Sequence, residues 1–530
     1  MRRPAVIALA ALIGAACDAP FEFQAQVAAI HVIPDTLSLQ AGDSVQLSAQ
    51  VTDSSGHVLS ATVYWSSSVD SAATVSSRGL VRSLAPGIVV IRASAGGVND
   101  SARLFIAPYV AGIGFDQGSV VTVPGASIPF TAYAIDRQGN TFVAPLLTWS
   151  SSDTTVFTVS SSGVVQARGV GVAELGAGTR TTRGTTPIRV IAPVFQSVSA
   201  GEADHTCGVT TDSLAFCWGA AGLGQLGVPG VSSVPAPVTR PNGLAFTAVH
   251  SGGTFTCGDS PTKVYCWGSN FRGRLGIGIA GPATSAAPLP PFLTVIFHGT
   301  STGWNDTCGL SFTTLICWGE SPTAGEAPNS VQYFPTLLTS DSVLVSLDVS
   351  VEFACGLTAY GSPMCWGDNS TGQLGNGSGS SSYHPVPVAG GYAFVAIGGG
   401  NSHACGLTAA GAVYCWGNNS NGQLGTGDTV SSPTPELVVT GVSFGTLDAG
   451  GAQTCALAAD STAYCWGLGT STPTPVTGGR HFKTISVGDR HVCGLGADGR
   501  VYCWGANDRG QLGDGTFVNR PSPTLVLGQP

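Results

Sequence analysis

Apolar and polar residues alternate in short runs along much of the chain, as in the stretch from Val45 to Val51. Alternation with a period of two is typical of β-strands that bury one face. Within residues 405–415, two β-favouring runs flank Gly411, which stands where a three-residue hairpin loop requires a positive φ. Gly361 and Gly499 occupy the same position in two similar hairpins. These patterns predict an all-β fold with tight turns.

The longest apolar run, from Ala5 to Ala16, follows Arg2 and Arg3. Basic residues, a short apolar run and small residues in that order are typical of a signal peptide, which we assign to residues 1–16. The run is well short of the roughly 20 residues that a membrane-spanning helix needs. We therefore expect an exported protein without a transmembrane segment.

All of the 15 cysteines except Cys17 fall into couples that end in Cys-Trp-Gly, with members nine or ten residues apart. The members of a couple would face each other across a hairpin, at a Cα separation of about 4.5–5.5 Å that suits a disulfide. Zinc sites, the alternative, use shorter spacings and gather four ligands. We favour disulfides, which persist in an oxidising compartment and agree with export. The predicted pairs are Cys207–Cys217, Cys257–Cys266, Cys308–Cys317, Cys355–Cys365, Cys405–Cys415, Cys455–Cys465 and Cys493–Cys503.

Cys17, the cysteine left over, directly follows Ala15 and Ala16 at the end of the apolar run. This segment resembles the lipobox of bacterial lipoproteins, although Gly14 stands where that family prefers Leu. The resemblance implies that Cys17 is lipidated after cleavage and that residues 17–27 form a short tether. The alternative is a secreted protein, cleaved nearby, with one spare thiol.

Two segments ahead of the cysteine-rich region match each other at an offset of 83 to 85 residues. Their period and short alternating runs predict β-sandwiches in tandem, over residues 28–108 and 109–193. The strand, turn and closing Ala-Pro patterns resemble bacterial immunoglobulin-like domains of group 2, which implies a stalk or an adhesive module. We expect the two tryptophans to pack in the cores. The matched positions are Gly42 with Gly125, Asp53 with Asp136, Trp65 with Trp149, Gly79 with Gly163, and Ala107-Pro108 with Ala192-Pro193.

From Phe195 onward the repeat period becomes about fifty residues, and a Cys-Trp-Gly string closes the same segment of each repeat. Each unit contains four short β-type runs and cannot bury both of its faces alone. Seven such units predict a seven-bladed β-propeller over residues 194–530, with one disulfide per blade. The fold class is therefore all-β, with two immunoglobulin-like sandwiches followed by the propeller.

The strings Val413-Tyr-Cys-Trp-Gly and Asn-Gly-Gln423-Leu-Gly resemble repeats of the regulator of chromosome condensation family. That family includes exported bacterial propellers, among them a secreted β-lactamase inhibitor. Its best-known activity, guanine-nucleotide exchange, acts on a cytosolic or nuclear GTPase, and export disfavours it here. We expect the glutamines of the repeat to hold its turn geometry rather than bind a ligand; they are Gln225, Gln373, Gln423 and Gln511.

The composition limits the class of partner. Charged residues make up 10% of the chain, and 21 basic residues face 30 acidic ones. Only two of the basic residues are lysines, Lys263 and Lys483. Neutralising a phosphate backbone needs many cations, so we do not expect a nucleic-acid partner.

Residues with catalytic potential are sparse. The chain has no phosphate loop, metalloprotease helix or nucleophile elbow. His205, His403 and His491 share one position of the repeat, and we expect them to form structural hydrogen bonds, since a sevenfold ring keeps equivalent residues apart. Three acids in the corresponding loops could act as a pair only if a cleft brought them together; they are Asp204, Asp306 and Asp489. We expect no catalytic residue, no metal site and no cofactor.

One set of loops stands out as a binding surface. Antiparallel strands reverse at each loop, so the first and third loops of the blades share one face. Trp304 lies in the first loop of blade three, and Phe271 and Arg272 lie in the third loop of blade two. Aromatic and arginine side chains are typical of interface hot spots. The alternative for Trp304 is that its ring fills the gap between two blades.

Two classes of function remain open. One is a lipid-anchored or secreted protein that binds a protein or glycan through a propeller face, with the sandwiches as spacer. The other is a secreted enzyme inhibitor or an enzyme. An enzyme would show an axial pocket with clustered carboxylates or histidines, whereas a binder would show a broad face with aromatic residues. The sequence favours the non-enzymatic binder and names neither its ligand nor its oligomeric state.

Replacing Cys17 with Ser should release the protein from membranes, because lipidation requires the thiol. Fractionation of cells that express each form measures this directly. An unchanged distribution between membrane and soluble fractions would show that Cys17 carries no anchor.

Overall fold

The computed structural model describes residues 26–143, 147–179, 181–228, 233–239, 244–278, 284–291, 296–320, 331–338 and 342–530. Cys17 and the predicted signal peptide lie outside these residues. The described chain is built from strands, with one short 3-10 turn, η1 (Phe271–Gly273). None of its helices is long and apolar enough to cross a bilayer. The chain divides into two compact units, Met1–Ile113 with Tyr133–Leu146, and Gly114–Ala132 with Leu147–Pro530.

The first immunoglobulin-like region packs three small sheets, in the orders β1-β4, β3-β7-β6 and β2-β9-β8-β5. Trp65 is partly buried against this core, and a side chain at Gly79 would lie 3.1 Å from its ring. Gly79 has a positive φ of 80° at the turn, so both its conformation and the close ring favour glycine. The strands are β1 (Ala29–Ile33), β2 (Thr36–Gln40), β3 (Ser44–Gln46), β4 (Ser48–Thr52), β5 (Tyr64–Ser67), β6 (Ala73–Val75), β7 (Leu80–Ser83), β8 (Gly87–Ala95) and β9 (Val98–Ala107).

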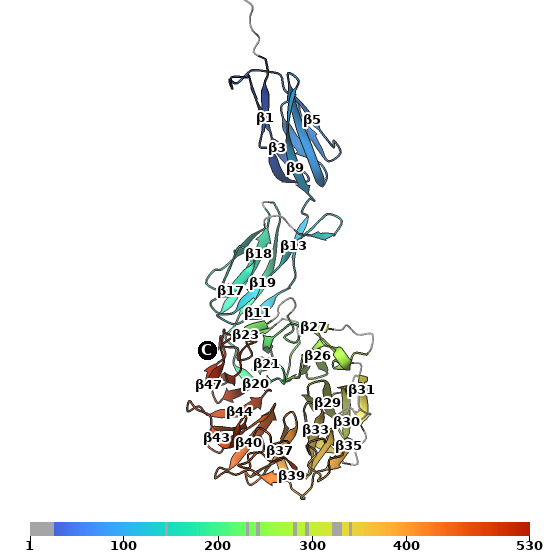
Figure 1. Ribbon diagram of the computed structural model, residues 1–530, viewed down its shortest axis with the longest axis vertical. Helices are drawn as coiled ribbons and strands as arrows, with labels where there is room; N and C mark the ends of the chain where they lie inside the picture. Colours follow the sequence, from blue (N-terminus) through green and yellow to red (C-terminus); the bar gives the residue numbers. More distant parts are fainter. Residues whose placement is uncertain are drawn as a thin grey trace, which may run out of the picture. The chain divides into compact units, whose positions relative to one another are not determined.

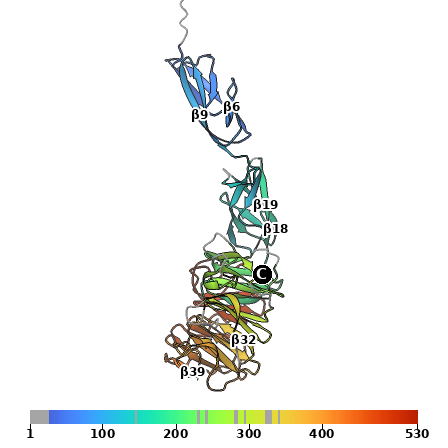
Figure 2. The same cartoon turned by 90° about the vertical axis from the view of Figure 1, so that its right-hand side faces the viewer.

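The following strands repeat this arrangement, with β18 and β19 side by side in Figure 2. Trp149 packs against Gly163 as Trp65 packs against Gly79, which supports the predicted repeat and a packing role for both tryptophans. The boundaries at residues 28, 109 and 194 stay predictions. The strands are β10 (Gly112–Phe115), β11 (Val120–Thr122), β12 (Ser127–Pro129), β13 (Ala132–Ile135), β14 (Thr141–Phe142), β15 (Thr148–Ser151), β16 (Phe157–Val159), β17 (Val164–Ala167), β18 (Gly171–Gly178) and β19 (Arg183–Val190).

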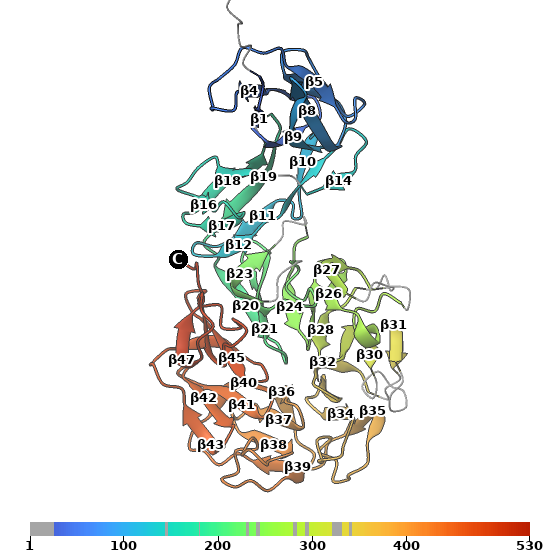
Figure 3. The ribbon, with the colours of Figure 1, turned by 45° about the horizontal axis from the view of Figure 1, so that its top comes forward.

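The remaining strands form seven antiparallel four-stranded blades, which Figures 1 and 3 show around a common axis. The outer strand of blade one, β23, also pairs with β11. The blades are β20 (Phe195–Ala200), β21 (His205–Thr210), β22 (Ala215–Ala220), β23 (Ser233–Thr239); β24 (Ala248–Ser251), β25 (Phe255–Asp259), β26 (Val264–Ser269), β27 (Thr284–Leu289); β28 (Gly299–Thr302), β29 (Asp306–Ser311), β30 (Thr314–Glu320), β31 (Val331–Leu338); β32 (Leu344–Val349), β33 (Phe353–Thr358), β34 (Pro363–Gly367), β35 (Ser382–Pro387); β36 (Phe394–Gly399), β37 (His403–Thr408), β38 (Val413–Gly417), β39 (Ser432–Leu437); β40 (Phe444–Gly450), β41 (Gln453–Ala458), β42 (Ala463–Gly467), β43 (Thr470–Pro475); and β44 (Phe482–Val487), β45 (His491–Gly496), β46 (Val501–Gly505), β47 (Arg520–Leu525).

The inner strands of the blades lie next to one another around the axis. Each contacts the inner strand of the following blade, and β44 of blade seven contacts β20 of blade one, so the ring closes. The seven-bladed propeller predicted from the repeat count is confirmed.

One disulfide joins the second and third strands of every blade, as predicted. The two cysteines stand directly opposite each other in the strand register, and their Cα atoms are 4.0–4.1 Å apart. Gly411 of the fifth hairpin has the expected positive φ, 83°, as do Gly361 and Gly499. The pairs are those predicted from the sequence.

Neighbouring blades are joined by the tryptophan of Cys-Trp-Gly. In blades one, two, three and five, its indole N–H donates to a main-chain carbonyl in the third loop of the preceding blade. Trp416 donates to Gln373 at 2.9 Å, and Trp218 of blade one donates in the same way to Gln511 of blade seven. Because these indoles are buried, an unpaired N–H would be costly, and the bond fixes the position of one blade on the next.

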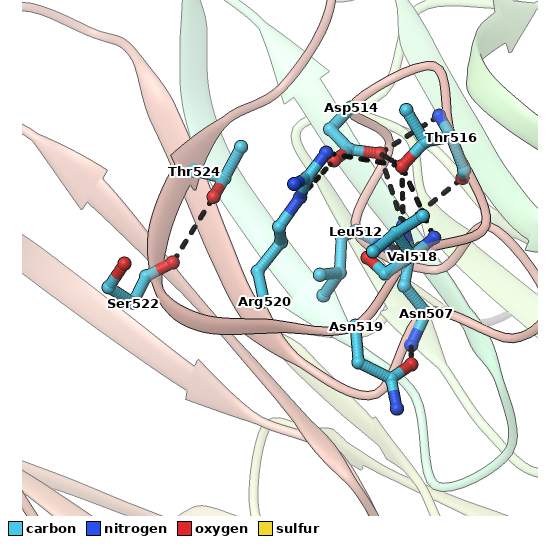
Figure 4. Close-up of polar contacts among 9 residues, drawn as sticks. All are labelled: Asn507, Leu512, Asp514, Thr516, Val518, Asn519, Arg520, Ser522 and Thr524. Atoms are coloured by element: carbon cyan, nitrogen blue, oxygen red, sulfur yellow. Dashed lines mark hydrogen bonds and ion pairs between the residues drawn. The ribbon is translucent and has the colours of Figure 1, made fainter.

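In blades two, four, five and seven, a buried asparagine holds the third loop. In blade seven, Figure 4 shows Asn507 enclosed by the loop: its amide donates to Asp514 and to the Thr516 and Val518 carbonyls, while its oxygen accepts from Leu512 N–H. The side chain of Gln511 is buried and accepts the Arg509 N–H at 2.9 Å. The other three predicted glutamines accept equivalent bonds, which confirms their role in the turn.

Peptide mapping without reduction should recover seven cystines, each within one blade, because the paired cysteines are directly opposed. Mass spectrometry of the non-reduced digest makes the measurement. A cystine between two blades, or free thiols at most of these positions, would contradict the arrangement.

Candidate functional site

The inner strand of each blade presents one equivalent residue, opposite the first cysteine of the blade. Around the ring this position is polar except at Gly398 of blade five. The residues are Ser199, His250, Ser301, Asp348, Gly398, Asp448 and Ser486.

Most of these side chains join their inner strand to the next one. Asp348 accepts the Gly399 N–H at 2.6 Å, and Asp448 accepts the Val487 N–H at 2.8 Å. The hydroxyls of three serines accept the corresponding bonds in blades one, three and seven. Aspartate and serine therefore serve the same structural purpose here, but only aspartate brings a second oxygen and an ionisable charge.

An axial cavity of about 130 Å³ lies where the inner strands end and the first loops begin. Its wall contains the ring residues that can titrate, together with one further acid. Glu202 reaches the wall from the first loop of blade one. The residues at the wall that can titrate are Glu202, His250, Asp348 and Asp448.

The acids of this cavity are held in a low-polarity environment. Burial raises the pKa of Asp348 to about 7 and that of Asp448 to about 8, the latter also through repulsion from Asp348. Burial raises the pKa of Glu202 well above its ordinary value, with added repulsion from surrounding carboxyls. Neutral pH therefore falls within the range where Asp348 and Asp448 exchange protons.

The three predicted histidines form structural hydrogen bonds, as expected. Nε2 of His403 pairs with the hydroxyl of Thr454 in the next blade at 2.8 Å, and His205 and His491 do the same with Thr256 and Thr206. Burial lowers the pKa of His205 to about 4 and that of the other two to about 3, so all three are neutral at pH 7. No cluster of three or more potential metal ligands occurs in the described part of the chain.

The three predicted acids divide into two environments. Asp204 of blade one pairs with Arg490 of blade seven at 2.9 Å and so joins the two blades, whereas Asp489 lies 4.0 Å from the same arginine within blade seven. Asp306 is buried in blade three, and burial raises its pKa well above normal, against the attraction of Arg274. Asp306 and Asp489 also act on Glu202.

The predicted binding residues lie on one connected surface, which we call the loop face and define by Phe271, Arg272 and Trp304. Phe271 is 60% exposed and Trp304 is 36% exposed. Arg272 pairs with Glu320, and the Nδ2 of Asn305 donates to the same carboxylate at 2.7 Å. The first loop of blade three thus meets the third loop of blade two, as the alternation of loops predicts.

Two details of the loop face were not expected from the sequence. Arg274 replaces the glutamine of the repeat; it is buried, and its guanidinium donates to Asn305 at 2.5 Å and lies 5.5 Å from the Phe271 ring. The Trp304 ring packs in part on Gly253 of blade two, where an added Cβ would lie 3.2 Å from it. Trp304 therefore partly fills the space between blades and partly faces solvent.

The sequence patterns did not reveal Glu202, Asp348 and Asp448 as site residues. Aligning the repeats on the first cysteine would have found the two aspartates, because they stand seven residues before it, where blade one carries Ala and the remaining blades carry Ser, His or Gly. Glu202 has no equivalent signal, since it reaches the axis from a loop. The axial cavity carries the carboxyls expected of an enzyme, and the loop face carries the aromatic residues expected of a binder.

Comparison with known proteins identifies both kinds of repeat. Two family models described as the regulator of chromosome condensation (RCC1) repeat match residues 212–258, 365–407, 410–457 and 498–530, and residues 394–423 and 482–511. A model of the bacterial Ig-like domain (group 2) matches residues 26–106.

Curated relatives share only a segment with this chain. Human "Probable E3 ubiquitin-protein ligase HERC6" is 30% identical over 36% of the chain and 20% of its own length. "Ice-binding protein 1" of Shewanella frigidimarina is 28% identical over 32% of the chain and 19% of its own length. The chain thus spans about a fifth of these relatives.

Solved structures share the propeller fold. Human WBSCR16 superposes with a TM-score of 0.55 at 20% identity, over 59% of this chain and 93% of that one. Prp20p from Saccharomyces cerevisiae superposes with a TM-score of 0.53 at 20% identity, over 62% and 87%. At this identity the likeness extends to the fold alone.

Relative to the original chain, the Asp448→Ser variant should gain stability progressively as pH rises from about 5 to about 8, and the difference should level off above pH 8. The folded pKa of about 8 exceeds the ordinary value of 3.8, so the stability from protonated Asp448 is present at low pH and is lost progressively as pH rises between these two values. Serine keeps the bond to the next strand, as in three other blades, without that loss. Thermal unfolding of both forms at each pH measures the difference.

The control is Asp460→Ser, at an exposed turn whose hydrogen bonds lower the carboxyl pKa. This residue stays ionised across the whole pH range tested, so its effect on the unfolding temperature should be constant. A constant difference for Asp448→Ser as well would show that Asp448 does not titrate there.

Proposed function

We propose that this chain, which contains a propeller of RCC1 repeats and a bacterial Ig-like group 2 domain, is an exported envelope or surface protein that binds a protein or glycan through its loop face. The sandwiches would act as a spacer, and a lipid at Cys17 would hold the protein to a membrane. Binding, rather than catalysis, is its proposed activity.

The observation that carries the proposal is the composition of the loop face. Phe271 remains 60% exposed although its ring is large and apolar, and the two neighbouring arginines lie within 5.5 Å of that ring. Aromatic and arginine side chains supply much of the energy of protein interfaces because they bury a large area with few rotatable bonds. The ion pair of Arg272 with Glu320 restrains this surface before a partner binds.

The comparisons support protein binding only at the level of fold. The structure of yeast Prp20p is described together with the binding of that protein to Gsp1p and histones. This chain would use the same fold for a different partner, since export would separate it from a nuclear GTPase. The ligase named in the human relative lies in a protein of which this chain spans 20%, so no ligase activity is proposed.

Export is supported by the seven disulfides, because cystines of this kind persist in oxidising compartments. The alternative is a secreted enzyme inhibitor, which would also act by binding a protein. An inhibitor would also bind its target through the loop face, so one experiment addresses both.

Replacing Trp304, Phe271 and Arg272 together with Ala should abolish capture of the partner by the full chain, with the unfolding temperature shifted by no more than a few degrees. The exposed rings supply contact area to a partner and little to the core. In the measurement, the immobilised protein is incubated with an envelope extract. The partner is the captured species whose retention requires the residues of the loop face.

The matched control replaces two aromatics and one arginine on the opposite face: Phe312, Tyr360 and Arg500, which belong to second loops. Phe312 and Tyr360 are 77% and 90% exposed. This control variant should capture the same species as the original chain. Capture by the loop-face variant, or loss of capture together with a collapse in stability, would refute binding by that face.

A further inference from the structure

Glu202 presents a carboxylate without a protein partner to the axial cavity. Its side chain is buried, with 8% of the residue exposed, and it lines the cavity. The Oε2 atom has no hydrogen-bond donor within reach. A buried carboxyl oxygen left unpaired is costly, so such a group indicates a ligand that supplies the missing donor.

The cavity acids also lack a neutralising cation. Among the described residues, no ion pair involves Glu202, Asp348 or Asp448. The basic side chains nearby are engaged with other acids: His250 contacts Asp259 at 3.1 Å, and Arg490 pairs with Asp204 at 2.9 Å. Arg274 attracts Asp306 and bonds to Asn305.

The acceptors surround the cavity instead of lying on one side of it. Glu202 comes from blade one, Asp348 from blade four and Asp448 from blade six. Each aspartate accepts the N–H of the next strand and one further hydrogen bond, from Ser301 to Asp348 and from the Ala449 backbone to Asp448. An ionised carboxylate has about four acceptor sites, so each still has acceptor capacity toward the cavity. A ligand that satisfies acceptors from several directions must be compact, cationic and rich in N–H donors.

We propose that the axial cavity binds a primary ammonium group, with the three N–H donors of that group directed at Glu202, Asp348 and Asp448. A primary ammonium is a compact charge with three donors on one nitrogen. The group could belong to a small amine or to a lysine side chain of a docked polypeptide. This inference goes beyond the proposed function, because it concerns the axis and not the loop face.

A bound ammonium explains why two blades carry aspartate where serine would suffice for the fold. Ser199, Ser301 and Ser486 join neighbouring strands as well as Asp348 and Asp448 do. Aspartate at this position adds charge that costs stability when it is buried without a partner. An ammonium ligand offsets that cost. Replacing either aspartate with serine removes the charge and keeps the hydrogen bond between neighbouring inner strands.

Binding should depend on pH, because an ammonium requires ionised carboxylates. The groups that face Glu202 are Asp348 and Asp448 from the inner strands, with Asp306 and Asp489 close by. His250 also acts on Asp348. Because burial raises the pKa of these acids, a bound ammonium should displace protons near neutral pH.

The test is isothermal titration of the full chain with methylammonium chloride at pH 6 and pH 8.5. We expect binding at pH 8.5 that is at least tenfold weaker at pH 6, with protons released to the buffer. N-acetyl-lysine methylamide is titrated in parallel. Tighter binding of that compound would assign the ammonium to a lysine side chain, and tighter binding of methylammonium would assign it to a small amine; either result supports the site.

Three comparisons make the test specific. Glu202→Gln, and Asp348→Ser combined with Asp448→Ser, should each weaken binding at least tenfold without loss of the folded state. Asp508→Asn removes one exposed charge of the loops outside the cavity and should leave binding unchanged. Tetramethylammonium has the same charge without N–H donors and should not bind.

Several results would overturn the proposal. They are the absence of methylammonium binding at pH 8.5, equal binding of tetramethylammonium, binding that survives both cavity variants, and binding of calcium ions that excludes methylammonium. The loop-face variant described above keeps all cavity residues and should bind methylammonium normally. Failure of the ammonium site is therefore distinguishable from failure of the proposed function.

Discussion

The propeller depends on the packing of the Cys-Trp-Gly indole against the third loop of the preceding blade, with a hydrogen bond between them in blades one, two, three and five. A four-stranded blade has two apolar faces and cannot cover both, so its stability comes from its neighbours. The indole supplies a large apolar surface and one N–H donor, which is paired in these four blades, whereas the buried N–H of Trp466 in blade six has no partner among the described residues. Trp416 in mid-chain and Trp218 at ring closure form the same bond at the same length, 2.9 Å. The acceptor carbonyl must stand at one position, and in blade seven Asn507 holds its loop there by bonds to both ends.

The ring that these bonds assemble creates the two surfaces with functional potential. Seven inner strands converge on the axis, and the residues opposite the first cysteines are placed around one cavity. The loops above that cavity lie on the same side as the loop face, because the first and third loops of antiparallel blades share one face. The same strand reversals therefore place the ionisable side chains at the axis and the exposed aromatic side chains at the rim. The disulfides stabilise individual blades, whereas the indole bonds stabilise the ring on which both surfaces depend.

The sequence by itself determined the elements that are local or repeated. Cysteine spacing, the glycine of each hairpin and the period of the repeats predicted the disulfides, the blades and the all-β class, because each depends on contacts within about ten residues or on simple repetition. The alternation of antiparallel loops was sufficient to place Trp304 and Phe271 on one face. The roles of His205, His403 and His491 also followed, from the separation of equivalent residues in a ring.

Only the tertiary structure decided what meets at the axis. Asp348 and Asp448 lie a hundred residues apart in the chain, and Glu202 lies farther away still, so no local pattern relates them. Their proximity arises from ring closure, which brings blades one, four and six around one cavity and removes their carboxyls from bulk water. The replacement of a repeat glutamine by Arg274 is visible in the sequence, but its burial beside Phe271 depends on how blade three packs against blade two.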